Sequence, residues 1–152
     1  MHFNKIKILV LTVVLLSGCA QVTPKVTQID ERVFRVATTV YDGFSVGLDR
    51  SNEGIARATI RAAANTAQSV GCPYFAAINN DSQTFRPNAA KVTEEFTKLP
   101  DGSYIYTAED GVRFRVVKPA QRGGTFLCFK NKPTALLPGL IYNTDLVLSS
   151  TK

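Results

Sequence analysis

The first 19 residues restrict what this chain can fold into more than any other feature, because their pattern predicts that most of them are removed. Two lysines lie near the start, an apolar run covers residues 8–16, and the small residues Ser17 and Gly18 precede Cys19. This order is typical of a secretory signal peptide, and the apolar run is shorter than the roughly 20 residues of a membrane-spanning helix. We therefore expect an exported chain whose fold is built from the residues that follow the leader.

Residues 16–19, with the sequence LSGC, resemble the lipobox of bacterial lipoproteins, the substrates of signal peptidase II. The resemblance implies that residues 1–18 are cleaved off between Gly18 and Cys19. It also implies diacylglycerol on the Cys19 sulfur and an acyl chain such as palmitate on its amine, with no other cofactor. Ala20, and not Asp, follows Cys19, which resembles the pattern of outer-membrane lipoproteins that face the periplasm. An inner-membrane location is the alternative.

The exported part is short enough for a single domain. Hydrophobic residues make up 45% of the chain and charged residues 20%, as in folded domains. Residues 20–30 are polar, carry no helical apolar stripe and include Pro24. The pattern predicts a lipidated N-terminus and flexible tether over residues 19–30, followed by one α+β domain over residues 31–152.

One stretch of this domain has the pattern of an amphipathic helix. Ser51 or Asn52 offers an N-cap, and alanines and other apolar residues recur on one face as far as Val70. Gly71 supplies the C-terminal stop. Because the apolar face is made largely of small side chains, we expect this helix to pack flat on a sheet and not on a membrane surface.

Segments rich in β-branched and aromatic residues, separated by turn sequences, predict the strands. They cover residues 33–48 (with a break or hairpin at Asp42-Gly43), 73–78, 91–99, 104–107, 112–117, 125–129 and 140–148. Turns at residues 100–103 and 109–111 would join three strands into an antiparallel meander, and Gly123-Gly124 is a further turn candidate. The predicted class is α+β, an antiparallel sheet of about 5–6 strands with one main amphipathic helix on one face.

Two cysteines remain once Cys19 carries lipid, and export takes them to an oxidising compartment. A disulfide between Cys72 and Cys128 is therefore predicted, and it would join the end of the helix to a strand. The alternative is a pair of buried free thiols. Two cysteines without a histidine make a poor zinc site, so no metal is expected.

The single histidine, His2, lies in the leader, so the mature chain has none. Catalysis by Ser-His-Asp or Cys-His sets is thereby excluded. Paired carboxylates leave a glycosidase as one enzymatic hypothesis. Its candidate residues are Asp81, Glu94, Glu95, Glu109 and Asp110. Solvated surface carboxylates are the preferred explanation of this set, and we expect no enzyme.

Two pairs of residues are candidates for a binding surface. Arg57 and Arg61 are one helical turn apart and could hold an anion, although a solvated helix face is the preferred explanation. Tyr104 and Tyr106 share a strand face and could bind glycan or a partner, although packing in the core is preferred. Two of the 18 basic residues lie in the leader, which leaves 16 scattered ones against 12 acidic residues. Nucleic-acid binding is not expected from this pattern.

The mature domain resembles small, uncharacterised α+β envelope lipoproteins in which a strand, an alanine-rich helix and a second strand follow one another. The run covers residues 33–79, and Gly71, Tyr74 and Phe75 carry the resemblance. We expect a membrane-anchored, non-enzymatic envelope protein that binds another envelope protein or serves in an assembly such as a secretion or conjugation apparatus. The alternative is an inhibitor or binder of cell-wall-active enzymes or glycan, acting through the turns at residues 100–103 or 109–111.

Overall fold

The computed structural model describes residues 22–40, 52–79 and 91–150. The strands are β1 (Val22–Gln28), β2 (Val33–Val40), β3 (Tyr74–Ile78), β4 (Glu95–Lys98), β5 (Tyr104–Thr107), β6 (Arg113–Val116), β7 (Gly123–Phe129) and β8 (Ile141–Asn143). The helices are α1 (Asn52–Ser69) and α2 (Thr144–Ser150). The strands form one antiparallel sheet in the order β1-β2-β7-β3-β6-β5-β4, with β8 also pairing with β3.

The predicted α+β class with an antiparallel sheet is confirmed. The predicted numbers of strands and helices were too low, because the described residues contain eight strands and two helices. The meander is also confirmed, since β4, β5 and β6 pair in sequence order. The second half of the segment predicted as a strand over residues 33–48, with the turn candidate Asp42-Gly43, lies outside the described residues.

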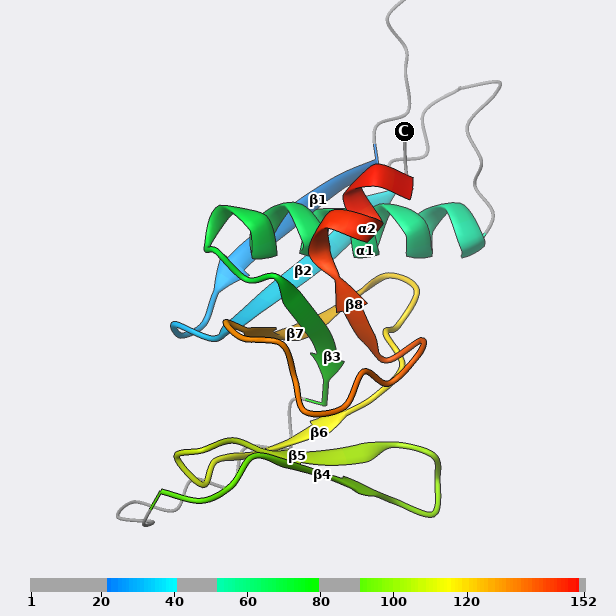
Figure 1. The fold of residues 1–152 in the computed structure, drawn as a ribbon. Coiled ribbons are helices and arrows are strands. Elements are labelled where there is room, and N and C mark those ends of the chain that lie inside the picture. Colours follow the sequence, from blue (N-terminus) through cyan, green and yellow to red (C-terminus); the bar gives the residue numbers. More distant parts are fainter. Residues whose placement is uncertain (1–21, 41–51, 80–90, 151–152) are drawn as a thin grey trace, which may run out of the picture.

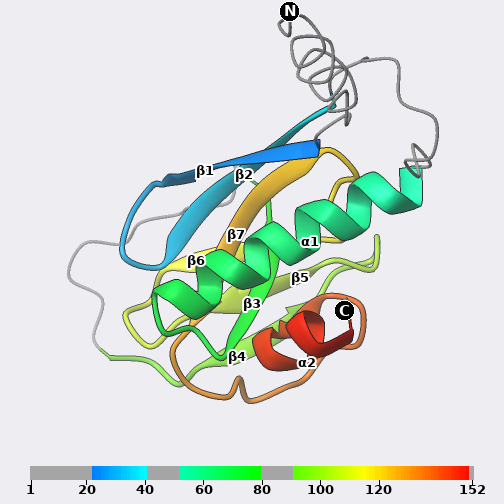
Figure 2. The same ribbon diagram turned by 90° about the horizontal axis from the view of Figure 1, so that it is seen from above.

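The sheet turns back over itself, which gives the domain three layers (Figures 1 and 2). The helices lie on one face of β2, β7 and β3, and the meander lies against the opposite face. Both faces of β3 and β7 are therefore covered. This explains why YFAAI in β3 and FLCF at the end of β7 are continuous apolar runs without the alternation of a half-exposed strand.

The helix-facing core depends on the small side chains of α1. Ala63, Ala64 and Ala67 are fully buried, and they pack with the aromatic rings of Phe34 and Phe126 from the sheet. Because alanine is short, the helix axis can approach the strands closely, as the sequence pattern predicted.

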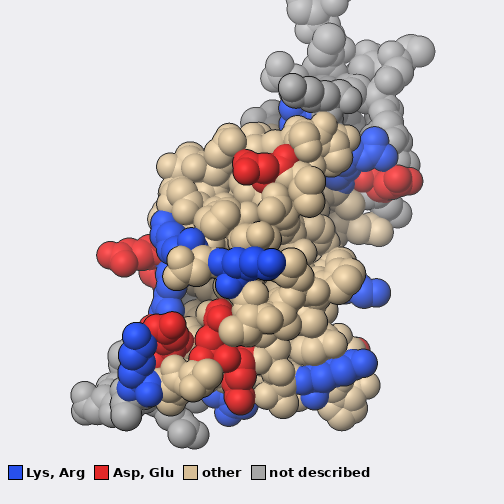
Figure 3. Space-filling view, viewed as in Figure 1, with Lys and Arg blue, Asp and Glu red and all other residues tan. Residues whose placement is uncertain are grey.

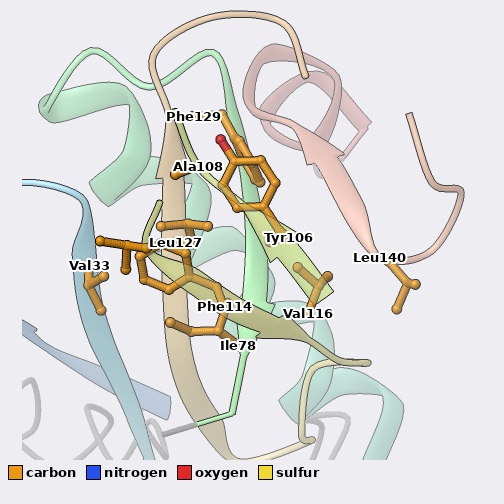
Figure 4. Packing of buried hydrophobic residues seen from close by; sticks show 11 residues of the cluster. Val33, Ile78, Tyr106, Ala108, Phe114, Val116, Leu127, Phe129 and Leu140 are labelled. Carbon is orange, nitrogen blue, oxygen red and sulfur yellow. The ribbon is translucent and has the colours of Figure 1, made fainter. Parts of the chain in front are cut away.

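The opposite core is aromatic and lies between the central strands and the meander (Figure 4). The ring of Tyr106 stacks on Phe114 at a centroid distance of 6.2 Å and meets Phe129 edge-on at 5.0 Å. Val33 and Leu127 supply the central-strand side of the same cluster. These contacts hold the meander against the sheet.

The predicted tether over residues 19–30 was wrong for Val22–Gln28, which forms strand β1. This strand pairs with β2 along its whole length, from Val22 opposite Val40 to Gln28 opposite Phe34. Pro24 favoured the prediction of a tether, but a proline is tolerated in an edge strand, where its missing N–H is not required for pairing. Residues 22–28 consequently belong to the folded domain, which was predicted to begin at residue 31.

The predicted last strand over residues 140–148 was also wrong in its second half. Residues Ile141–Asn143 form β8, but Thr144–Ser150 form α2. Asn143 caps this helix, since its side-chain Oδ1 accepts a hydrogen bond of 3.0 Å from the Leu146 N–H. Val147 and Leu148 follow Thr144 by three and four residues, which places them on its side of the helix, and they pack against the helix-facing core.

Gly123-Gly124 is not the turn that the sequence suggested. Both glycines lie inside β7, where Gly123 is opposite Ala37 and Gly124 is opposite Val36 of β2. The turn precedes them, and a bridge between Ala120 and Gly123 closes it.

The β4–β5 turn is fixed by the carboxylate of Asp101. Its Oδ1 accepts hydrogen bonds from the Ser103 hydroxyl at 2.6 Å and from the Ser103 N–H at 3.0 Å, and Oδ2 pairs with Arg115 on β6. The Ser103 donors, followed by Arg115, lower the pKa of Asp101 to about 2.

We expect the Asp101 contribution to stability to be lost in acid. Because the folded pKa lies below the unfolded value, the contribution is complete above the ordinary pKa of 3.8 and disappears as the pH falls toward 2. A carboxyl-carbon NMR titration should give the low midpoint, and Ser103→Ala should move it back toward 3.8. Wild type and Asp101→Asn should differ in stability at pH 5 and converge near pH 2. A midpoint at the ordinary value would contradict the geometry of the turn.

Candidate functional site

The predicted lipidation site lies outside the described residues. Gly18 and Cys19 precede Val22, the first described residue, so cleavage and lipidation stay predictions. In the described part of the chain, no helix is long and apolar enough to cross a membrane.

The predicted disulfide is present in the structure. Cys72 and Cys128 are bonded with their Cα atoms 5.5 Å apart, and both side chains are buried in the helix-facing core. Thr144 lies beside this bond, where its hydroxyl donates a 2.6 Å hydrogen bond to the Cys72 carbonyl. The disulfide therefore ties the end of α1 to β7 at the place where α2 also begins.

The structure does not bring the four candidate binding residues into one surface. Arg57 lies on the exposed face of α1 and pairs with Glu53 at 3.1 Å, and Arg61 is exposed on the same helix. Tyr106 is only 8% exposed, and Tyr104 is partly buried against the same aromatic core. The helix α1 and strand β5 lie on opposite sides of the central strands, so the arginine pair and the tyrosine pair are separate (Figure 1).

Three of the carboxylates considered for a glycosidase do share a pocket, which has a volume of about 270 Å³. They are Glu94, Glu109 and Asp110, together with Tyr106. The Tyr106 hydroxyl donates a 2.7 Å hydrogen bond to Glu94 Oε1. Burial and this hydrogen bond raise the pKa of Tyr106 above its ordinary value, so the hydroxyl stays protonated near neutral pH.

Two of the three carboxylates in this pocket are held in ion pairs. Asp110 pairs with Arg32 at 2.8 Å, and Glu109 pairs with Lys91 at 3.0 Å. Burial opposes ionisation of Asp110, but the Val112 N–H and Arg32 outweigh it and lower the pKa of the carboxyl. A glycosidase needs one carboxyl whose pKa is raised so that it can donate a proton. Asp110 does not meet this requirement.

Two further glycosidase candidates do not line this pocket among the described residues. Glu95 is exposed on the edge strand β4, and Asp81 lies outside the described residues. Within the described ranges, no three His, Cys, Asp or Glu side chains gather to hold a metal ion. On the face shown in Figure 3 most side chains are uncharged, and basic and acidic side chains adjoin in places, chiefly at the lower left.

A second pocket, of about 360 Å³, lies at another place on the sheet, and three basic residues are among those that line it. Arg35 projects from β2, and Lys118 and Arg122 lie in the connection between β6 and β7. Alternation along β2 places Arg35 and Ala37 on the same face as Val33. Val33 is covered by the meander, whereas Arg35 and Ala37 are exposed, so the pocket lies where this cover ends.

The connection that carries Lys118 and Arg122 is held by buried hydrogen bonds. The Thr59 hydroxyl of α1, which is fully buried, lies 3.2 Å from the Gln121 carbonyl oxygen and 2.7 Å from the Thr38 hydroxyl of β2. The Thr38 N–H also donates to the Arg122 carbonyl at 3.3 Å. The backbone on this side of the pocket is therefore fixed to both α1 and β2.

Sequence reasoning missed this pocket because its three cations come from distant segments. Arg35 is far from Lys118 and Arg122 in the sequence, and only the fold of β2 beside β7 brings them together. No run of like charge marks the site. The short segment KPAQRGG, residues 118–124, is the one local signal, since it combines two cations with a glycine pair.

Comparison with protein-family models, curated proteins and solved structures finds no match for this chain.

Proposed function

We propose that this chain is a bacterial envelope lipoprotein, anchored through lipid on Cys19, whose domain binds another envelope protein or takes part in an assembly. The observation that carries this proposal is the complete LSGC sequence at the end of an apolar leader. The Cys72–Cys128 disulfide supports it, because such bonds persist in oxidising compartments outside the cytosol.

The start of β1 determines how the domain would sit on its anchor. Val22 lies three residues after Cys19, and three extended residues reach at most about 10 Å. The domain would therefore lie close to the lipid surface, and it would not be separated from the surface by a long tether. We place it at the periplasmic face of the outer membrane, following the Ala20 pattern.

The edge strand β1 is our candidate for partner binding. It ends the strand order of the sheet, and β2 is its one partner strand among the described residues. An exposed edge can pair with an extended segment of another protein, which is a common mode of recognition. Val26 and Ile29, with 41% and 53% of their surfaces exposed, add apolar contact area at this edge. Such an edge fits a component of a larger apparatus, with no catalytic role.

The anchor is tested by the intact mass of the protein extracted from membranes of a bacterial host. We expect a chain that begins at Cys19 and carries diacylglycerol plus an acyl chain. Cys19→Ala should abolish both cleavage and lipidation, and Ala20→Asp should keep the lipid but shift the protein to the inner membrane. An unlipidated wild-type mass would overturn the anchor.

Partner binding is tested separately by photocrosslinking in intact cells. A photoreactive residue at Thr27 of β1 should give a discrete crosslinked species, whereas the same residue at the exposed Asn131 serves as the control. Equal crosslinking from both positions, or none from Thr27, would argue against β1 as the binding edge.

A further inference from the structure

The pocket at the start of β7, beside the middle of β2, has the charge pattern of an anion site. Arg35, Lys118 and Arg122 contribute three positive charges, and no acidic residue is among the described residues that line it. In this respect it differs from the pocket of Tyr106, which is lined by both carboxylates and cations.

The cations of this pocket are also available to a ligand. The ion pairs of the described residues engage four other basic residues, Arg32, Arg57, Lys91 and Arg115. In the same ranges no ion pair or side-chain hydrogen bond engages Arg35, Lys118 or Arg122. Three like charges around one hollow repel one another, and a bound anion would relieve that repulsion.

The shape and the support of the pocket fit a polyoxygen anion. A volume of about 360 Å³ is within the usual range of ligand pockets and exceeds what a single water needs. The guanidinium groups of Arg35 and Arg122 can each donate two parallel hydrogen bonds to phosphate oxygens. Because Thr59 and Thr38 hold the backbone carbonyls of Gln121 and Arg122, binding would need little ordering of the backbone there.

A fourth cation extends the same face toward the N-terminus. Lys25 of β1 lies opposite Ala37, which lines the pocket, and directly opposed residues in a sheet share a face. Lys25 is exposed and only six residues after Cys19. A lipid surface at the anchor would therefore lie near the basic face.

We propose that the Arg35–Lys118–Arg122 pocket binds a phosphate group. Two sources share this chemistry, the phosphate of a lipid headgroup and a soluble phosphate. The charge and geometry of the pocket do not depend on lipidation of Cys19. Failure of the proposed anchor would therefore not overturn the phosphate site, and failure of the site would not overturn the anchor.

The test uses the full chain, purified in a neutral maltoside detergent and followed by the backbone amide NMR signals of Gly123, Gly124 and Thr125. In one arm, inorganic phosphate is titrated; in the other, phosphatidylglycerol is added to the micelles, with phosphatidylcholine as the zwitterionic lipid control. We expect saturable shifts that weaken as sodium chloride is raised. The triple variant Arg35→Gln, Lys118→Gln, Arg122→Gln should weaken binding by roughly tenfold or more.

A matched variant separates the pocket from net charge. Lys98→Gln, Arg113→Gln, Lys132→Gln removes the same number of charges from exposed positions that do not line the pocket, and it should bind like wild type. Saturation in the phosphatidylglycerol arm alone identifies a lipid headgroup as the source, and saturation with inorganic phosphate alone identifies a soluble ligand. Equal weakening in both triple variants, or no saturable shift in either arm, would overturn the proposal.

Discussion

Replacing Cys72 and Cys128 together by alanine is expected to lower the free energy of unfolding by about 4 kcal/mol. The bond joins residues separated by 56 positions, so it removes a large part of the freedom of the unfolded chain. That amount is a large fraction of the total stability of a domain of this size. Urea unfolding of the oxidised wild type and of the double variant measures the difference.

Reduction provides the control for this prediction. Wild type under a phosphine reductant should lose nearly the same free energy as the double alanine variant, because both lack the crosslink. The remaining difference between them reports the packing of the two sulfur atoms, which belong to residues that are 1% and 4% exposed within the helix-facing core. A double variant as stable as oxidised wild type would show that the bond contributes nothing to this fold.

The elements that sequence reasoning predicted well are those in which local and tertiary signals agree. Helix α1 has an alanine face that matches the sheet it covers, and it ends before Gly71, whose φ of 71° suits the left-handed position of a helix C-terminus. Strand β5 was predicted with its observed bounds because turn sequences limit it on both sides. In these segments the residues nearby in sequence are sufficient to determine the structure.

The failed predictions come from segments where a distant partner decides the conformation. Residues 22–28 have no strong pattern of their own, and they become a strand because β2 offers a complete row of hydrogen-bonding partners. Residues 144–150 alternate like a strand. However, β3 begins at Tyr74, which pairs with Asn143, so β8 has no partner residues on β3 beyond Asn143. The apolar side chains that follow pack on α1 as part of a helix. Local propensity is too weak to resist either effect.

The candidate site shows the same limit. The disulfide could be predicted because export and two cysteines leave few choices. The basic pocket could not, since Arg35 and Arg122 become neighbours only through the pairing of β2 with β7. For Tyr106, by contrast, the sequence pattern favoured a place in the core over a role in binding. The structure places it in the aromatic core.

Gly123→Ala is expected to lower the free energy of unfolding by about 2–4 kcal/mol, because the backbone of β2 lies in close contact with Gly123 of β7. Gly123 has a φ of 133°, and an added Cβ would lie 2.5 Å from the Val36 carbonyl oxygen and 3.3 Å from the Ala37 Cα atom. Both neighbours are backbone atoms of β2, so a rotamer change cannot relieve the contact. The strands would have to separate where Phe34 and Phe126 stack across them.

Gly102→Ala is the matched control for this prediction. Its φ of 82° is also in the left-handed region, but an added Cβ would meet no heavy atom within 4 Å. It should therefore cost only the conformational penalty of about 1–2 kcal/mol. Thermal and urea unfolding of both variants separate backbone conformation from the clash with β2. Equal losses in the two variants would mean that β7 does not approach β2 as closely as the structure shows, and the shape of the basic pocket beside it would then have to be revised.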